Sequence, residues 1–320
     1  MDFFFYTSVF CFVIFDVNRR DAEAQSPDES PLRTSASQRL YLEFLPMLPP
    51  PPPRIRVFHP ELCKGQLALV TGAGTGLGRA IADQLAEAGA DLILAARNVE
   101  RLEQAASEIR AAYGRRVETA FVNIRDRASV EALGETVRAQ HGQVDMLINN
   151  AGGQFAQPAR DFSAKGWQAV IDTNLTGTWN MTQVLGTQML DGRGGSITTI
   201  IAVIGRGFPG IAHTSAARAG LLELAKSLAI EWGPKVRINC VAPGPIQTEA
   251  FKVTYDPQIE TLCEGIPIAR FGGPDEIAYA AVYLASPAAS WITGEVLYVA
   301  GGQQIYGRNQ ALFDEAFRRG

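Results

Sequence analysis

The chain has 320 residues, of which 47% are hydrophobic and 19% are charged, and its formal net charge at pH 7 is -4. Disordered proteins contain fewer apolar residues and more charge, so a chain that is disordered throughout is excluded. The mildly acidic balance disfavours a nucleic-acid-binding protein, which usually carries a basic face, and no apolar run is long enough for stable insertion into a membrane.

Residues 1–58 differ in composition from the rest of the chain. The apolar segment at 3–15 is too short to span a bilayer, and the positive charge that precedes the core of a signal peptide is missing. Five consecutive prolines at 49–53 favour an extended polyproline conformation. We predict a disordered or non-native extension over 1–58, with a membrane-targeting leader as the alternative.

From residue 59 onward, short apolar runs alternate with segments of helical spacing. Helices are expected at 76–88 and 98–112, where apolar residues recur every three or four positions. The runs that predict strands lie at 67–70, 92–95, 117–122, 146–148, 196–200, 236–241 and 296–299. Such alternation implies a parallel sheet with helices on both faces. We predict one doubly wound α/β domain of Rossmann type over 59–305, with a seven-stranded parallel sheet, followed by a C-terminal tail at 306–320.

A glycine-rich turn follows the first predicted strand. Residues 71–78 read TGAGTGLG, and a helical segment begins at once. Glycine lets the backbone turn tightly and approach a pyrophosphate, and the free N–H groups at the start of the helix attract its charge. A tight turn without a ligand is the alternative. The predicted phosphate-binding residues are Gly72, Thr75, Gly76, Leu77 and Gly78.

The end of the second predicted strand indicates which dinucleotide binds. NAD-binding proteins place a carboxylate there for the ribose 2′-hydroxyl, whereas this chain has Ala96, Arg97 and Asn98. A guanidinium pairs with a 2′-phosphate through two parallel hydrogen bonds. We therefore predict NADPH as the cofactor, with Arg97 and Asn98 at its adenosine end. A solvated Arg97 without a ligand is the alternative.

Four motifs together resemble those of the short-chain dehydrogenase/reductase family. Beside the glycine pattern, they are NNAG at 149–152, NLTG at 174–177 and PGPI at 243–246. The resemblance covers about residues 62–303. It implies further cofactor contacts, which are Asn123, Ile124, Asn150, Ala151, Gly152, Pro243, Gly244, Ile246 and Thr248.

The catalytic positions depart from the common pattern of the family, which is a serine followed by Tyr-x-x-x-Lys. The serine position is Ala202, and Thr214 and Arg218 replace the tyrosine and the lysine. Reduction of a ketone needs a proton on oxygen, which a tyrosine of lowered pKa can supply. A threonine hydroxyl cannot be brought into that pKa range, and loss of a general acid typically slows a reaction ~10²–10⁴-fold. An ordinary alcohol dehydrogenase is therefore disfavoured.

An α,β-unsaturated thioester makes a different demand on the site. Hydride addition at C3 moves negative charge to the thioester oxygen, and hydrogen-bond donors suffice to stabilise that enolate. We predict that Thr214 donates one such bond and that Arg218 holds the nicotinamide ribose and adds positive field. His213, which can titrate near neutral pH, is a candidate proton donor to C2, and a packed imidazole without a proton role is the alternative. The family resemblance implies that Asn174 holds an active-site water, with a local backbone bond as the alternative.

Several segments resemble one branch of the family, the peroxisomal trans-2-enoyl-CoA reductases. They are GGQF at 152–155, KGW at 165–167, GFP at 207–209 and HTSAARAG at 213–220. Residues 198–200, 243–246 and 289–292 are also similar to the 2,4-dienoyl-CoA reductases. Both branches replace the tyrosine by a small hydroxyl residue and use NADPH on acyl-CoA, and Arg218 favours the enoyl branch.

We therefore predict an NADPH-dependent trans-2-enoyl-CoA reductase that acts on an acyl-CoA thioester and has no nucleic-acid partner. The alternatives are a dienoyl-CoA or branched-enal reductase of the same branch and a nucleotide-binding protein without turnover. Apolar positions on several sides of 216–232 predict a homo-oligomer, a tetramer as in the family. The segment 245–272 is interpreted as a lid over the acyl chain, with a surface helix pair as the alternative.

The four cysteines, Cys11, Cys63, Cys240 and Cys263, are widely separated and form no CxxC pair. We expect free thiols in a reducing compartment, and we predict a cytoplasmic protein. The chain has three histidines and no cluster with metal-ligand spacing, so no metal site is expected. Residues 318–320 read RRG, which is not a peroxisomal signal of the Ser-Lys-Leu type.

Overall fold

The computed structural model describes residues 50–203, 205, 210–248, 263 and 266–305. Several sequence-based predictions lie outside these described residues. They concern the extension over 1–49, the motif at 207–209, the larger part of the lid segment at 249–262 and the tail at 306–320.

Seven parallel strands form one sheet in the order β3-β2-β1-β4-β5-β6-β7. The strands are β1 Leu67–Thr71, β2 Asp91–Ala96, β3 Val117–Phe121, β4 Met146–Asn149, β5 Gly195–Ile200, β6 Val236–Pro243 and β7 Val296–Val299. The chain winds from β1 to one edge and from β4 to the other, which confirms the predicted doubly wound α/β fold. All five residues of β1 are buried, because helices cover the sheet on both sides.

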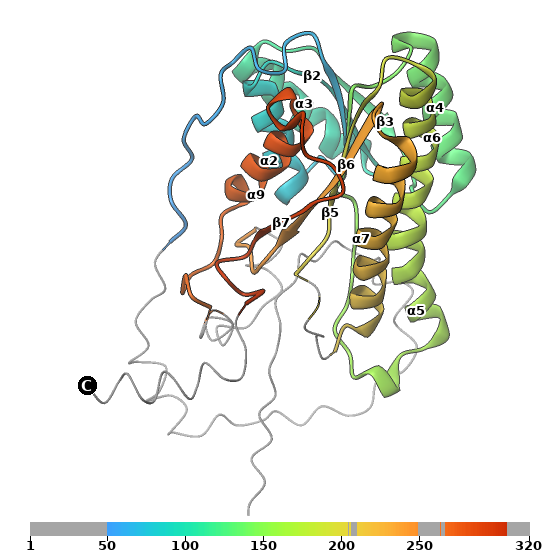
Figure 1. Ribbon diagram of the computed structural model, residues 1–320, viewed down its shortest axis with the longest axis vertical. Helices are drawn as coiled ribbons and strands as arrows, with labels where there is room; N and C mark the ends of the chain where they lie inside the picture. The colour runs from blue at the N-terminus through green and yellow to red at the C-terminus, as the bar shows by residue number, and fades with distance from the viewer. Residues whose placement is uncertain (1–49, 204, 206–209, 249–262, 264–265, 306–320) are drawn as a thin grey trace, which may run out of the picture.

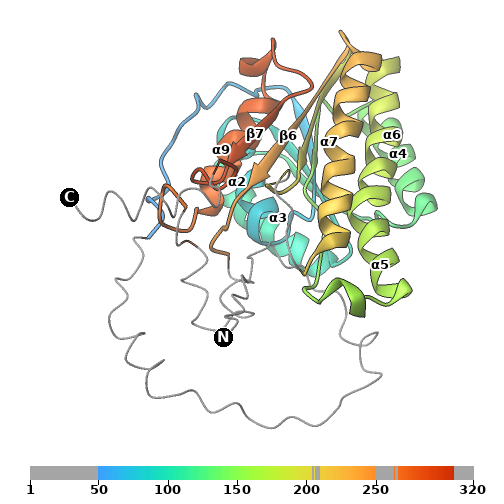
Figure 2. The same cartoon turned by 60° about the horizontal axis from the view of Figure 1, so that its bottom comes forward.

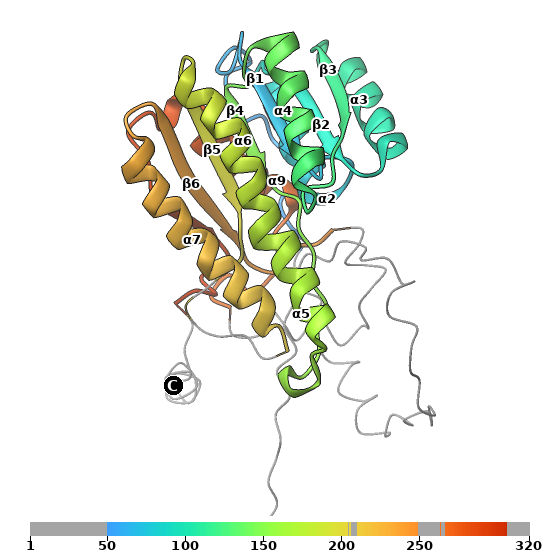
Figure 3. The same cartoon turned by 90° about the vertical axis from the view of Figure 1, so that its right-hand side faces the viewer.

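The helices lie in two layers, with α2, α3 and α9 on one face of the sheet and α4, α6 and α7 on the other, as Figures 1 and 3 show. Their bounds are α2 Gly76–Glu87, α3 Val99–Tyr113, α4 Arg127–His141, α5 Ala164–Ile171, α6 Gly177–Asp191, α7 Ala212–Trp232 and α9 Pro274–Ala285. Short 3-10 turns lie at Ala159–Asp161 and Pro287–Ala289, and a π-helical turn joins α5 to α6 at Asp172–Thr176. No helix in the described part of the chain is both long and apolar enough to cross a membrane.

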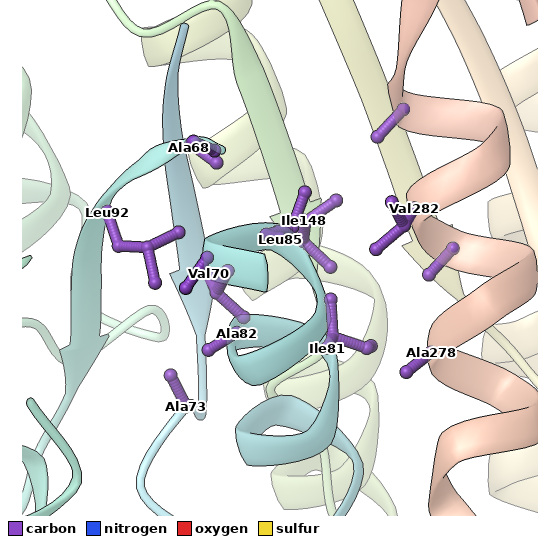
Figure 4. Packing of buried hydrophobic residues seen from close by; sticks show 14 of the residues in the cluster. Ala68, Val70, Ala73, Ile81, Ala82, Leu85, Leu92, Ile148, Ala278 and Val282 are labelled. Atoms are coloured by element: carbon purple, nitrogen blue, oxygen red, sulfur yellow. The ribbon is translucent and has the colours of Figure 1, made fainter. Parts of the chain in front are cut away.

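The core on one face of the sheet fixes where α2 begins. Figure 4 shows Ile81 and Leu85 of α2 directed towards Val70 of β1 and Ile148 of β4, with Val282 of α9 alongside. All five side chains are fully buried. Burial of one such side chain stabilises the fold by about 1.5–3 kcal/mol. Because Ile81 and Leu85 are four residues apart, they lie on one face of the helix and hold its start at the carboxyl end of β1.

The strand order places a topological switch point between β1 and β4, which are neighbours in the sheet. After β1 the chain passes to α2 on one face, and after β4 it passes to α5 and α6 towards the other face. The connections diverge there, at the carboxyl ends of the strands, where ligands of doubly wound sheets bind. The fold therefore predicts a ligand site at the carboxyl ends of β1 and β4.

Residues 51–58, which we assigned to the N-terminal extension, lie against the domain. Arg54 Nη2 donates to Glu87 Oε2 on α2 at 2.7 Å, and the Ile55 N–H donates to the Tyr279 hydroxyl on α9 at 3.0 Å. The structure thus places Arg54 and Ile55 beside α2 and α9, and the predicted boundary after residue 58 stays a prediction. An extended segment has no internal hydrogen bonds, so its backbone is free to bond to the domain instead.

Candidate functional site

The glycine turn after β1 has the geometry of a phosphate-binding loop. Gly72 and Gly76 have φ values of +67° and +56°, which side chains rarely adopt, and a Cβ on Gly78 would lie 2.3 Å from the carbonyl oxygen of Gly72. Thr75 precedes α2 in extended conformation without a side-chain cap, so the first N–H groups of the helix have no side-chain acceptor there. Leu77 is buried in the core. The loop thus leaves room and N–H donors for a pyrophosphate.

The hydroxyl of Thr71 ties this loop to the end of β4. It accepts from the backbone N–H groups of Asn150 and Ala151, both at 3.0 Å, and donates to the carbonyl of Ile148 at 3.2 Å. The Asn150 side chain in turn donates to the carbonyl of Thr71 at 2.9 Å. Sequence reasoning placed Asn150 and Ala151 against the cofactor but missed Thr71, for which a hydroxyl at a strand end was the available signal.

The predicted adenosine end lies at the carboxyl ends of β2 and β3. Arg97 follows β2, is exposed, and has no ion pair within the described residues. The Asn98 side chain accepts from the Arg101 N–H at 2.9 Å and so caps α3. The Asn123 side chain accepts from the Arg125 N–H at 3.3 Å, which leaves its amide N–H₂ group free to donate to a base. Arg97 is thus one of the exposed cations in this region that remain available to an anion.

The opposite end of the site is formed by the chain that follows β6. Pro243 ends that strand, and the Gly244 N–H donates to β7, where a Cβ on Gly244 would meet backbone at 2.8 Å. Ile246 is buried and forms a bridge to a segment near α9. The Thr248 side chain returns to the glycine turn, where its methyl group lies 4.0 Å from the position of a Cβ on Gly76. The two halves of the predicted cofactor site therefore meet.

Asn174 lies in the π-helical turn between α5 and α6 and is fully buried. Its Nδ2 donates to the Gly153 carbonyl at 2.8 Å, and its Oδ1 accepts from the Gly153 N–H at 2.9 Å. The Thr178 hydroxyl donates to the Asn174 carbonyl at 2.9 Å, so the wider turn leaves that carbonyl satisfied. Asn174 therefore holds the segment after β4 in place, and its predicted hold on a water stays a prediction. Ile124 is buried beneath the same helix and accepts a hydrogen bond from α6 through its carbonyl.

Arg218 of α7 brings a cation to the carboxyl edge of the sheet. Its Nη1 donates to the Ile200 carbonyl at the end of β5 at 2.9 Å, and its Nη2 lies 3.4 Å from Asn174 Oδ1. No carboxylate of the described residues pairs with it. Burial lowers the pKa of the guanidinium to about 10, so the group is still charged at neutral pH. A Cβ on Gly152 would lie 2.5 Å from Nη2, so a side chain there would have to displace the guanidinium.

Thr214 and His213 lie in the first turn of α7, and Figure 2 shows this helix beside α5 and α6. Both side chains are buried. The Thr214 N–H donates to His213 Nδ1 at 2.7 Å, and the Thr214 hydroxyl lies 3.3 Å from the same nitrogen. The sequence did not predict this contact between the Thr214 backbone and the His213 ring. It also missed Phe155 and Phe162, which pack on the imidazole.

The structure brings most of the predicted residues to one edge of the sheet. A cradle for a pyrophosphate, an unpaired guanidinium and a buried hydroxyl lie along the carboxyl ends of β1, β4, β5 and β6. The arrangement can bind a dinucleotide and stabilise negative charge that develops on a ligand near Arg218. Among the described residues no group of histidine, cysteine, aspartate or glutamate could hold a metal ion.

The chain is similar to known proteins over most of its length. A family model described as Enoyl-(Acyl carrier protein) reductase matches residues 72–304. The peroxisomal 2,4-dienoyl-CoA reductase of Danio rerio is 36% identical over 258 residues, which are 79% of this chain and 86% of that protein. The 3-oxoacyl-[acyl-carrier-protein] reductase FabG of Escherichia coli (strain K12) is 40% identical over 244 residues, 76% of this chain and 98% of that protein.

A solved structure shares the fold as well. A 7α-hydroxysteroid dehydrogenase complexed with NADH and 7-oxo glycochenodeoxycholic acid has a TM-score of 0.72 and 32% sequence identity, over 77% of this chain and 98% of that chain. The chain is an oxidoreductase of the short-chain dehydrogenase/reductase family, as its motifs predicted.

Proposed function

We propose that the protein uses NADPH to reduce the 2,3 double bond of a trans-2-enoyl-CoA. The observation that carries the proposal is the pair of residues that replaces the family's tyrosine and lysine. Thr214 cannot act as a general acid near neutral pH, whereas Arg218 is a half-buried cation without a carboxylate partner in the described part of the chain. Such a site is suited to stabilise an anion rather than to protonate an alkoxide.

The residues of the site match the charge that this reaction develops. When bound, a reduced nicotinamide supplies a hydride to an electron-poor carbon, which in an enoyl thioester is C3. Negative charge then grows on the thioester oxygen. The Thr214 hydroxyl donates a hydrogen bond to that oxygen, and the positive field of Arg218 adds to it. One such donor typically contributes about 10²–10³-fold to kcat.

The proposed cofactor rests on the adenosine end of the site. Arg97 is an exposed guanidinium without an ion pair in the described residues, and no carboxylate follows β2 to favour NADH. A 2′-phosphate gives this guanidinium a bidentate partner. The glycine turn and the Thr248 side chain lie at the two sides of the proposed pyrophosphate position.

A second candidate is reduction of a 2,4-dienoyl-CoA. It is favoured by the similarity to the Danio rerio enzyme of that name. The same site serves both reactions, because in each of them a conjugated thioester accepts the hydride and its oxygen takes up charge. The similarity to FabG does not favour ketone reduction here, since Thr214 and Arg218 replace the groups on which that proton transfer depends.

A homotetramer in the cytoplasm remains part of the proposal. Ile230 on α7 is 86% exposed, and Trp179 on α6 is 37% exposed. Exposed apolar side chains on adjacent helices are typical of a surface that another copy of a chain covers.

The test uses the purified full-length chain with NADPH, and it follows cofactor absorbance with trans-2-decenoyl-CoA, a 2,4-dienoyl-CoA and a 3-oxoacyl-CoA in turn. We expect oxidation with the enoyl ester and little with the 3-oxoacyl ester. Turnover of the dienoyl ester alone favours the second candidate. Tight NADPH binding without turnover of any ester points to a nucleotide-binding protein and rejects both reductase activities.

Two arginine variants test the cofactor in the same assay. Arg97→Ala should weaken NADPH binding roughly tenfold or more and leave NADH binding nearly as it is, because a charge-assisted bond to the 2′-phosphate is lost. Arg138→Ala is the matched control, since Arg138 is also exposed but lies near the end of α4, at the opposite edge of the sheet. An equal NADPH preference in Arg97→Ala and wild type removes Arg97 from the site.

A further inference from the structure

His213 is enclosed by an aromatic clamp, which we define as Phe155, Phe162 and Trp167. The imidazole is stacked on the Phe162 ring with centroids 4.4 Å apart and an interplanar angle of 7°, and the Phe155 ring meets its edge at 4.6 Å and 78°. The Trp167 ring lies at 6.5 Å. The clamp comes from the segment that follows β4 and from α5, so His213 connects α7 to the opposite wall of the site. Its exposure is 0%.

The hydrogen bonds of His213 define its protonation state. Nδ1 accepts from the Thr214 N–H at 2.7 Å, and an imidazole nitrogen accepts only when it carries no proton. The proton of the neutral ring is therefore on Nε2, which is buried and has no hydrogen-bond partner among the described residues. An unpartnered buried donor is unfavourable, and the fold tolerates it to keep an acceptor beside Thr214.

This acceptor completes the start of α7. The residue before the helix, Ile211, offers no side-chain cap, so the first N–H groups of the helix need other partners. The His213 ring serves one of them. Because a ring nitrogen has a single lone pair and the N–H at 2.7 Å already uses it, the Thr214 hydroxyl at 3.3 Å is held in reach without being consumed. It remains able to donate to a ligand oxygen.

The surroundings of the ring disfavour a positive charge on it. Burial lowers the pKa of His213, and the carbonyl of Ile211 offsets part of that effect. The ionisable residues on the segments that contact the ring are Arg160, Asp161, Lys165 and Arg218, and none of them contributes to this pKa. The imidazole is thus neutral at physiological pH, which opposes a role as the proton donor to C2.

We infer that His213 is a positioning residue whose neutral imidazole holds the first turn of α7 and thereby the Thr214 hydroxyl, and that protonation of this ring at acidic pH releases the turn. A protonated Nδ1 is a donor, so it repels the Thr214 N–H instead of accepting from it. The inference has two halves. The structural half says that His213 Nδ1 accepts from the Thr214 N–H, and it does not depend on the reaction. The rate half says that this bond supports turnover, and it rests on the proposed reductase function.

The structural half is tested on the whole protein with ¹⁵N-labelled histidine. The signals that are present in wild type and absent from His213→Asn identify His213, and two-bond ¹H–¹⁵N correlation spectra at pH 7.5 should show for this histidine a proton on Nε2 and an unprotonated Nδ1. A proton on Nδ1 of that histidine overturns the inference, whether or not the protein reduces any thioester.

The rate half compares two variants over pH 5 to 8 with NADPH and trans-2-decenoyl-CoA. In wild type, kcat should fall at acidic pH, where the ring is protonated. His213→Asn places an amide oxygen near the position of Nδ1 and cannot be protonated. This variant should therefore keep most of the wild-type kcat at neutral pH and should not show the fall at acidic pH. His213→Phe keeps the stacking and lacks the acceptor, so its kcat should be lower at every pH by roughly tenfold, the rate equivalent of one hydrogen bond.

The outcomes separate the two hypotheses. An acidic fall in kcat that persists in His213→Asn assigns that fall to another group and overturns the rate half. Equal kcat in His213→Phe and wild type overturns it as well. If wild type turns over no thioester, the proposed function fails, while the spectra still decide whether His213 is the acceptor for Thr214. The same spectra decide the inference if His213→Phe does not fold.

Discussion

Arg218 illustrates how one side chain changes the chemistry open to a site. Its guanidinium bonds to the end of β5 and approaches Asn174 Oδ1, yet no carboxylate in the described part of the chain neutralises it. A half-buried cation without a counter-ion among the described residues is costly to the fold, and this cost falls when an anion forms beside it. Arg218 therefore destabilises the protein slightly when no anion is near it, and it stabilises the negative charge that develops in the proposed reaction.

Substitution of Arg218 tests this coupling. Arg218→Ala should reduce kcat with an enoyl-CoA about 10²-fold and weaken NADPH binding, because it removes the positive field at the developing charge. Arg218→Lys keeps the charge but not the paired N–H groups, so it should recover part of the rate. Steady-state kinetics and a fluorescence titration with NADPH measure the two effects. Wild-type kcat in Arg218→Ala would contradict the assignment.

At this scale the sequence predicted residues that a motif places by local spacing. The glycines of the phosphate loop and Arg97 could be predicted because they follow strand ends directly, and their contact with a cofactor stays a prediction. Thr71 and the aromatic clamp were not found. Thr71 acts on Asn150, which is far from it in the chain, and Phe155 reaches His213 only because the segment after β4 meets the start of α7.

The phosphate loop and α2 act as one element, and Gly78 is the residue on which their contact depends. A Cβ at Gly78 would lie 2.3 Å from the Gly72 carbonyl oxygen and 2.5 Å from Asn150 Nδ2, so the loop would have to move. At Gly74 the nearest atom would be 3.4 Å away, which is an ordinary contact, and the backbone there is not in the left-handed region.

This difference gives a matched pair of variants. Gly78→Ala should lower the free energy of unfolding by about 1–3 kcal/mol through overpacking, and it should lower cofactor affinity with it. Gly74→Ala should change that free energy by less than about 0.5 kcal/mol. Urea denaturation of the two variants and wild type measures the effect. Equal stability of Gly78→Ala and wild type would show that the loop adapts without cost.

The elements themselves followed from sequence patterns where those patterns were local. The helix expected at 98–112 is α3 at Val99–Tyr113, because its apolar face and the Asn98 cap are both encoded in neighbouring residues. The contacts of the segment 51–58 were not predicted, because its partners on α2 and α9 lie up to 224 residues away in the chain. The proline-rich composition of the segment predicts that it forms no helix or strand, but it does not predict that the segment contacts α2 and α9.

For the whole molecule, the buried imidazole predicts a dependence of stability on pH. The pKa of His213 in the folded protein lies below its ordinary value of 6.5, so between these two values the unfolded chain binds more protons. The free energy of unfolding should therefore fall as pH drops below about 6.5, by at most about 1.4 kcal/mol per pH unit, and the decline from this group should end below the pKa of the folded state.

Urea denaturation between pH 7.5 and 5 measures this dependence. His213→Asn should show a smaller decline than wild type, because the titrating group is gone. His59→Asn, at an exposed histidine, serves as the control and should follow the wild-type curve. Parallel curves for wild type and His213→Asn would show that the imidazole does not carry the dependence.

Taken by itself, the sequence determined the doubly wound fold and the family, and it predicted the phosphate loop. These properties follow from hydrophobic periodicity and from short motifs, which act within a few neighbouring residues. Tertiary structure decided the charge environment of Arg218, the tautomer of His213 and the docking of residues 51–58. Each of these depends on burial and on partners that are distant in the chain, and burial is what changes the energy of a charge or a hydrogen bond.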